Sequence, residues 1–87
     1  MNGRALVAWN LRRIRVKRGL SQERLAYDAD VDRSYVGGLE RQEENPTVDV
    51  LDRLAKTLEI SISELFKEPR PGAAIPKPLR GGRRPSR

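Results

Sequence analysis

The sequence predicts an all-α fold, and three observations support this prediction. Large apolar residues recur at spacings of three and four, as they do on the buried face of a helix. Ser21, Asp32 and Thr47, which are residue types that cap helices, stand directly before such stretches. No stretch alternates apolar and polar residues as a half-buried strand does. With 87 residues, the chain is long enough for one small domain.

The first helix carries Val7, Leu11 and Ile14 on one face, and Gly19 is expected to terminate it. Ser21 caps the second helix. A turn of a few residues follows, and Asp32 caps a short third helix. The apolar residues expected to face inward from the second and third helices are Leu25, Ala26, Ala29, Val36 and Leu39.

A polar loop over residues 40–46 separates the third helix from the fourth, which Thr47 caps. Ser61 or Ser63 opens a last short helix that ends in Leu65 and Phe66, and Phe66 is expected in the core. The buried stripe of the fourth helix is expected to comprise Val48, Leu51, Leu54, Ala55 and Leu58.

From Pro69 onward the composition changes. This stretch holds five prolines and three glycines, with only Ile75 and Leu79 as large apolar residues. Such a segment cannot bury enough surface to offset the entropy lost on ordering. We therefore expect a folded domain over residues 4–67 and a disordered basic tail over residues 68–87. The tail is interpreted either as a solubilising extension or as an electrostatic arm along DNA, and composition does not choose between them.

The composition also excludes several classes of function. The chain has no Cys and no His, which excludes a disulfide scaffold, a thiol nucleophile and the commonest metal ligand and general base. It has no glycine-rich phosphate loop and no metal-ligand spacing. We expect no catalytic activity, no cofactor and no metal. Because neither a membrane span nor a signal peptide is visible, a cytoplasmic protein is expected.

The net charge of +6 is unevenly distributed along the chain. Residues 1–22 carry six basic residues and no acid, and residues 69–87 do the same. Residues 23–68 carry six basic residues and twelve acids. The first 68 residues are therefore neutral in total, and net charge alone does not indicate nucleic-acid binding by the folded domain.

The motifs are more informative than the charge. Two short helices joined by a short turn describe a helix-turn-helix, although any small helical bundle can contain such a turn. Four segments carry a specific pattern: LSQERLA at 20–26, VDRSYV at 31–36, LER at 39–41 and NPT at 45–47. Together with the apolar pattern to residue 66, they resemble the phage-repressor (Cro/XRE) helix-turn-helix family. Residues 25–27 and 32–35 are most similar to the controller proteins of restriction–modification systems.

The resemblance implies a five-helix repressor-like DNA-binding fold in which the third helix enters the major groove. It implies that Gln22, at the start of the second helix, holds a phosphate together with the backbone N–H groups there. Arg41 would contact the DNA backbone beyond the third helix. Arg15 and Glu40 match a family pair that ties the first helix to the end of the third, which we interpret as structural.

By the same resemblance, the residues at the start of the third helix belong to the DNA-binding set. Asp32 is the first of these residues, and Arg33 and Ser34 occupy the positions at which the family reads base edges. An arginine can form two hydrogen bonds with guanine O6 and N7. Tyr35 is expected to contact a phosphate or a thymine methyl group.

Gly37 and Gly38 depart from the family pattern, because the family often carries groove-facing side chains at these positions. Either the backbone approaches DNA closely there, or these two positions read nothing. Glu43 and Glu44 place two acids in a loop that would run near the phosphates, which argues against a strong grip on the backbone by this loop.

These observations predict a sequence-specific transcriptional regulator that binds double-stranded DNA as a homodimer on a palindromic operator. One helix reads too few base pairs to select a site, and two-fold repetition solves this. The fourth and fifth helices, with Ile62, Leu65 and Phe66, are the expected dimer seam. The alternative is an antitoxin or similar module that binds DNA and a protein partner.

Overall fold

In the computed structural model of the chain, residues 1–70 are described. They contain four α-helices and one 3₁₀-helix, with no strand among them, so the all-α prediction is confirmed. The predicted fifth helix is a single 3₁₀ segment rather than an α-helix. The disorder predicted for the tail concerns mainly residues 71–87, which lie outside the described part. The elements are α1 (Gly3–Lys17), α2 (Gln22–Ala29), α3 (Arg33–Glu40), α4 (Val48–Leu58) and η1 (Ile62–Phe66).

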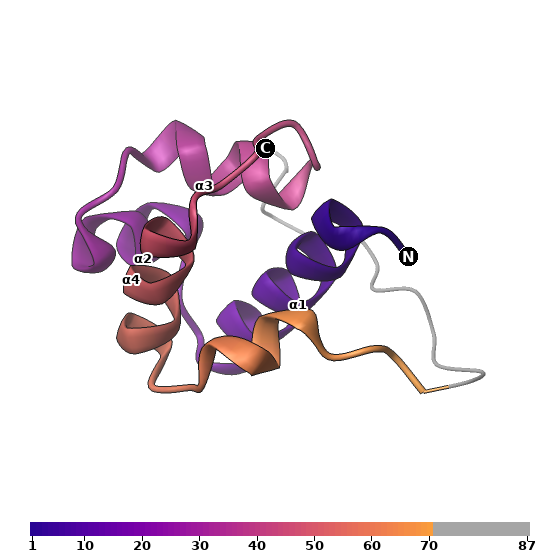
Figure 1. The fold of residues 1–87 in the computed structure, drawn as a ribbon. Coiled ribbons are helices and arrows are strands. Elements are labelled where there is room, and N and C mark those ends of the chain that lie inside the picture. The colour runs from indigo at the N-terminus through magenta and orange to yellow at the C-terminus, as the bar shows by residue number, and fades with distance from the viewer. Residues whose placement is uncertain (71–87) are drawn as a thin grey trace, which may run out of the picture.

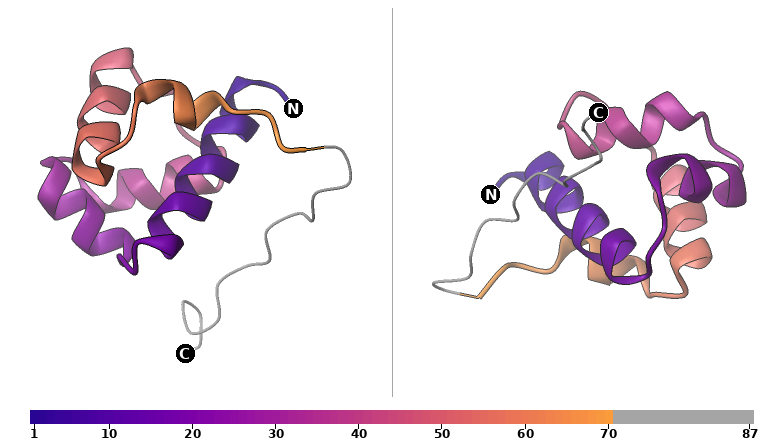
Figure 2. Two further views of the ribbon diagram at one scale, coloured as in Figure 1. Left: turned by 90° about the horizontal axis from the view of Figure 1, so that it is seen from below. Right: turned by 180° about the vertical axis from the view of Figure 1, so that it is seen from behind.

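The helices form one bundle around a shared core. α2 packs against both α3 and α4, while η1 bridges α4 and α1 and closes the bundle on the side away from α3 (Figure 1). Figure 2 shows the same segment running beside α1 in two further views, although some fifty residues separate them. No helix within residues 1–70 is long and apolar enough to cross a membrane.

Each element contributes at least one fully buried side chain to the core. These residues are Leu11, Leu25, Val36, Leu54 and Leu65, from α1, α2, α3, α4 and η1 in turn. The predicted core is wrong at two positions. Val48 and Phe66 are exposed, because each stands at the end of its element, and Val50 and Leu65 pack against the core instead.

The predicted N-terminal caps are confirmed. Ser21 accepts a hydrogen bond from the backbone N–H of Arg24, Thr47 accepts one from Val50, and Ser61 accepts one from Ser63. Asp32 accepts from Ser34 at the start of α3. The caps satisfy N–H groups that have no partner within their own helix, and so define where each helix begins.

All four α-helices end in the same way, with a residue of positive φ and a hydrogen bond that closes across the last turn. Gly19 takes this conformation after α1, with φ of 72°. Asp30, Gln42 and Glu59 adopt it after α2, α3 and α4 with φ of 59°, 64° and 60°, although left-handed geometry is unfavourable for residues with a Cβ. The crossing bonds run from the N–H of Leu20, Val31, Glu43 and Ile60 to the carbonyls of Arg15, Ala26, Gly38 and Ala55.

Asn10 holds η1 against α1, a contact that the sequence pattern did not indicate. Its side chain is fully buried, and its amide nitrogen donates to the carbonyl oxygens of Leu65 and Lys67 at 3.1 and 2.9 Å, and to that of Leu6 at 3.0 Å. Its side-chain oxygen accepts from Arg13 at 2.8 Å. Asn10, a polar residue on the buried side of α1, thus donates hydrogen bonds to backbone carbonyls at the end of η1.

The helix ends give a prediction with opposite signs at two sites. Glu59→Gly should stabilise the fold by roughly 0.5–1 kcal/mol, because the relief of left-handed strain exceeds the added backbone entropy of the unfolded chain. Gly19→Ala should destabilise it by about 1 kcal/mol. No atom lies within 4 Å of a Cβ added at Gly19, so the cost is conformational rather than steric.

Thermal unfolding followed by circular dichroism measures both effects, at about 4–8 °C per kcal/mol for a domain of this size. Shifts of the same sign in the two variants would contradict the assignment.

Candidate nucleic-acid interface

α2 and α3 are joined by a tight turn and packed as one unit. Asp30 reverses the chain after α2, Val31 packs partly against the core, and Asp32 caps α3. Val36 and Leu39 bury the inner face of α3. Because helical positions repeat every 3.6 residues, the opposite face of α3 carries residues 34, 37 and 38.

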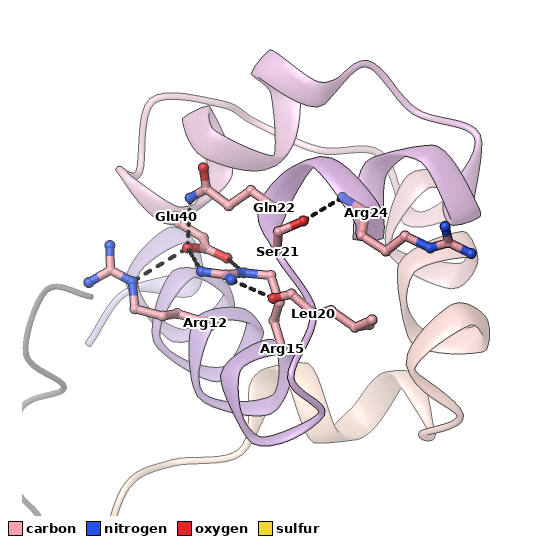
Figure 3. Close-up of polar contacts among 7 residues, drawn as sticks. All are labelled: Arg12, Arg15, Leu20, Ser21, Gln22, Arg24 and Glu40. Carbon is pink, nitrogen blue, oxygen red and sulfur yellow. Dashed lines mark hydrogen bonds and ion pairs between the residues drawn. The ribbon is translucent and has the colours of Figure 1, made fainter. Parts of the chain in front are cut away.

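A buried ion pair fixes this unit to α1. The Arg15 Nε and Nη2 atoms lie 2.6 and 2.9 Å from the two carboxylate oxygens of Glu40, and both side chains are almost fully buried. Arg15 also donates from Nη1 to the Leu20 carbonyl at 2.8 Å. One guanidinium therefore joins α1, the segment before α2 and the end of α3 (Figure 3).

Two further groups converge on Glu40. The Gln22 amide nitrogen donates to Glu40 Oε1 at 3.0 Å, and Arg12 Nε lies 3.4 Å from the same oxygen (Figure 3). The side chain predicted to hold a phosphate is thus also part of the buried network. Its second amide hydrogen and the N–H groups at the start of α2 are the donors for a phosphate contact, which stays a prediction.

The start of α3 is polar and solvent-exposed. The Asp32 side chain accepts from the Ser34 N–H at 2.9 Å and from the Ser34 hydroxyl at 2.6 Å. These hydrogen bonds, first that from the hydroxyl, lower the pKa of Asp32 below its ordinary value. The cap therefore contributes stability above the ordinary pKa, and that stability is lost as pH falls through the lowered one.

Arg33, predicted to read a base, projects from the first turn of α3. Its Nη1 lies 2.8 Å from Glu23 Oε2 on α2, and both side chains are about 70% exposed, at 73% and 70%. An exposed pair of this kind contributes about 0–1 kcal/mol. Arg33 can therefore exchange Glu23 for another acceptor at little cost.

Gly37 makes room for two predicted phosphate-binding side chains. A Cβ at this position would stand 3.0 Å from Arg41 Nη1 and 3.4 Å from Gln22 Oε1. Arg41 thus lies along α3 beside Gln22, with its Nε 3.0 Å from Glu43 on the exposed surface. The structure brings Gln22, Gly37 and Arg41 together at one edge of α3.

Tyr35 is half-buried beside the core rather than fully available at the surface. Burial raises the pKa of its hydroxyl, and the negative charge of Glu44 raises this pKa further. Glu44 also covers Gly38, so neither glycine on the outer face of α3 is bare.

Sequence reasoning missed the acids that partner these basic residues. Glu23 and Arg33 are ten residues apart on different helices, and Glu43 reaches Arg41 only because the chain turns at Gln42. The sequence does place twelve acids in residues 23–68, Glu43 and Glu44 among them in the loop after the third helix, but neither pattern indicates these pairs.

This arrangement, in which a capped α3 with an exposed first turn packs against α2, defines a helix-turn-helix protein. The family model described as "Helix-turn-helix" matches residues 11–65, and the chain belongs to this family.

Three similar proteins illustrate the relationship. The control protein C.SmaI of Serratia marcescens is 40% identical over 66 residues, covering 76% of this chain and 79% of its own. A Neisseria meningitidis hypothetical transcription factor is 36% identical over 66 residues, covering 76% of this chain. The controller protein C.Esp1396I, solved as a tetramer with its natural 35 base-pair operator, has 33% identity and a TM-score of 0.66, covering 77% of this chain and 99% of that one. The match spans 62% of the Neisseria protein's length.

The buried pair gives a second prediction. Arg15→Met should destabilise the fold by about 3–5 kcal/mol, because it leaves the Glu40 carboxylate buried without its main partner. The double variant Arg15→Met/Glu40→Leu should be more stable than this single variant, because it removes the unpaired charge.

Urea unfolding measures both variants. Arg18→Ala is the matched control, because its pair with Glu59 is exposed and 3.4 Å long, and its effect should stay within about 0.5 kcal/mol. A double variant less stable than Arg15→Met would contradict the cost assigned to the unpaired carboxylate, and one less stable than the wild type would show that the pair contributes net stability.

Proposed function

We propose that the chain is a sequence-specific DNA-binding transcriptional regulator that acts as a homodimer on a palindromic operator, with α3 in the major groove. One observation carries the proposal: Arg33 and Ser34 stand exposed at the start of a helix whose orientation a buried network determines. Gln22 and Arg41 flank that helix at positions suited to phosphates. The proposal includes the cytoplasmic location expected from the sequence and assigns no catalytic step.

Membership of the family and the operator complex of C.Esp1396I support this proposal. In it, Arg33 forms two hydrogen bonds with a guanine, Arg41 and Gln22 contact phosphates, and Asp32 keeps the first turn of α3 in place. Ser34 exchanges its hydrogen bond with Asp32 for one with a base edge.

For the homodimer, the exposed parts of α4 and η1 are the proposed seam. An open groove there is lined by Ala55, Ile60 and Ile62 among polar residues, and Phe66 is exposed at the end of η1. The sequence also predicted Leu65 in the seam. That prediction is wrong, because Leu65 is fully buried in the core of the single chain.

The antitoxin alternative and the electrostatic-arm interpretation both depend on the tail, most of which lies outside the described residues. Deleting residues 69–87 tests the arm. An arm that contacts several phosphates should steepen the salt dependence by roughly 0.9 per contact in log K against log salt. An unchanged slope would indicate that the tail makes no phosphate contacts and acts as a solubilising extension.

Arg33→Ala tests base reading directly. The operator is first obtained by selecting bound sequences from a random DNA pool with the full chain. The variant should then bind that operator about 1–3 kcal/mol more weakly and lose its preference at one base position in each half-site. Its binding to random duplex should change much less.

Arg18→Ala is the control, since it removes the same charge at the far end of α1 and should leave the base preference intact. If Arg33→Ala weakened specific and random duplexes equally, Arg33 would contact phosphate rather than a base.

A further inference from the structure

We propose that Glu44, in the loop after α3, is a base-reading residue that supplies the groove-facing side chain Gly38 lacks and accepts a hydrogen bond from cytosine N4. This inference rests on the proposed function, because it assumes that α3 lies in the major groove. It assigns a direct role in specificity to an acid that would otherwise only repel DNA.

Glu44 lies over the glycine at residue 38. A Cβ added at Gly38 would stand 2.7 Å from Glu44 Cγ, 3.3 Å from its Cδ and 3.0 Å from its Oε2. The Glu44 side chain therefore occupies the space of a residue-38 side chain. Gly38 is four residues after Ser34, so both lie on the outer face of α3, opposite Val36 and Leu39.

The turn after α3 holds Glu44 in this position. Gln42 takes a left-handed conformation, with φ of 64°, and the Glu43 N–H donates to the Gly38 carbonyl at 2.8 Å. The loop is thus folded back over the end of α3. Glu43 turns toward Arg41, whereas Glu44 is half-buried over Gly38.

A carboxylate in the major groove can pair only with hydrogen-bond donors. Ionised glutamate only accepts hydrogen bonds. In the major groove, cytosine presents the N4 amino donor with no acceptor beside it, adenine presents its N6 donor next to the N7 acceptor, and guanine presents two acceptors. Glu44 would be satisfied opposite cytosine and left unpaired opposite guanine, and an unpaired buried charge is costly. Much of the discrimination would therefore be a penalty against wrong sites.

The proposed role of Glu44 depends on the glycine at residue 38. Any larger residue would displace Glu44 from the helix, so the absence of a side chain on α3 is what admits one from the loop. Gly37 serves Arg41 and Gln22 in the same way. The sequence left two interpretations open: either the backbone approaches DNA closely at these glycines, or the two positions read no base. At Gly38 the Glu44 side chain makes both interpretations unnecessary.

The experiment is a selection of bound sequences from a random DNA pool with the full chain and three variants. The wild type should select cytosine at one symmetry-related position in each half-site, distinct from the position that depends on Arg33. Glu44→Ala should reduce the discrimination at that position by about tenfold or more and should bind random duplex more tightly, because an acid has been removed.

Gly38→Ala is the independent variant. Its methyl group should displace Glu44 and abolish the same cytosine preference, although no charge has changed and alanine favours the helix. The double variant Gly38→Ala/Glu44→Ala should lose no further discrimination at this position. Retention of the full preference in Gly38→Ala would overturn the proposal.

Glu43→Ala is the matched control, since it removes the neighbouring acid but leaves Glu44 over Gly38. It should strengthen binding to all duplexes alike and keep the cytosine preference. If Glu44→Ala behaved in the same way, Glu44 would act only by repelling phosphates, and the inference would fail while the Arg33-dependent preference remained. A wild type that selects no sequence would overturn the proposed function as well.

Discussion

The geometry of the helix-turn-helix depends on the carboxylate of Glu40, buried at the end of α3. It receives hydrogen bonds from Arg15 on α1 and Gln22 on α2, and Arg15 extends the network to the Leu20 carbonyl. Removing one partner of a buried pair is costly, whereas forming the pair adds little net stability. The network is therefore better understood as a constraint on orientation. It holds the first residue of α2 against the last residue of α3, the two ends that border the proposed phosphate contacts.

Beyond that constraint, the charges of the domain fall into two classes that behave differently. The Arg15–Glu40 pair is buried and maintains its geometry, whereas Arg33–Glu23 and Arg41–Glu43 are exposed. Exposed pairs contribute about 0–1 kcal/mol each, so their arginines can change partners at little cost. The acids thus keep the proposed DNA-binding side chains ordered without holding them tightly. They also explain how a domain with no net charge over its first 68 residues presents usable arginines.

Most of the fold could be predicted because it follows from local rules. Caps at Ser21, Asp32 and Thr47 and apolar residues at helical spacing place the four α-helices. Errors arose where tertiary contacts decide the outcome. Val48 and Phe66 continue an apolar pattern past the point where the bundle covers it. Asn10 reads as one polar residue in an amphipathic helix, and only the fold brings it to Leu65, 55 positions away. Non-glycine residues end three helices, because the crossing hydrogen bonds compensate the strain.

The same distinction between local rules and tertiary contacts applies to the candidate site. Family positions named Gln22, Arg33, Ser34 and Arg41, but they could not indicate what each side chain contacts in the free protein. The two glycines show why this matters. Taken as single positions, Gly37 and Gly38 mark missing side chains on the proposed reading helix, yet each is covered by a side chain from elsewhere. A recognition surface is made of side chains rather than of helix positions. When a helix position is empty, the surface depends on the loop that the helix end directs over it, here through Gln42. Specificity in this chain is therefore expected to depend on the residues after α3 as much as on α3 itself.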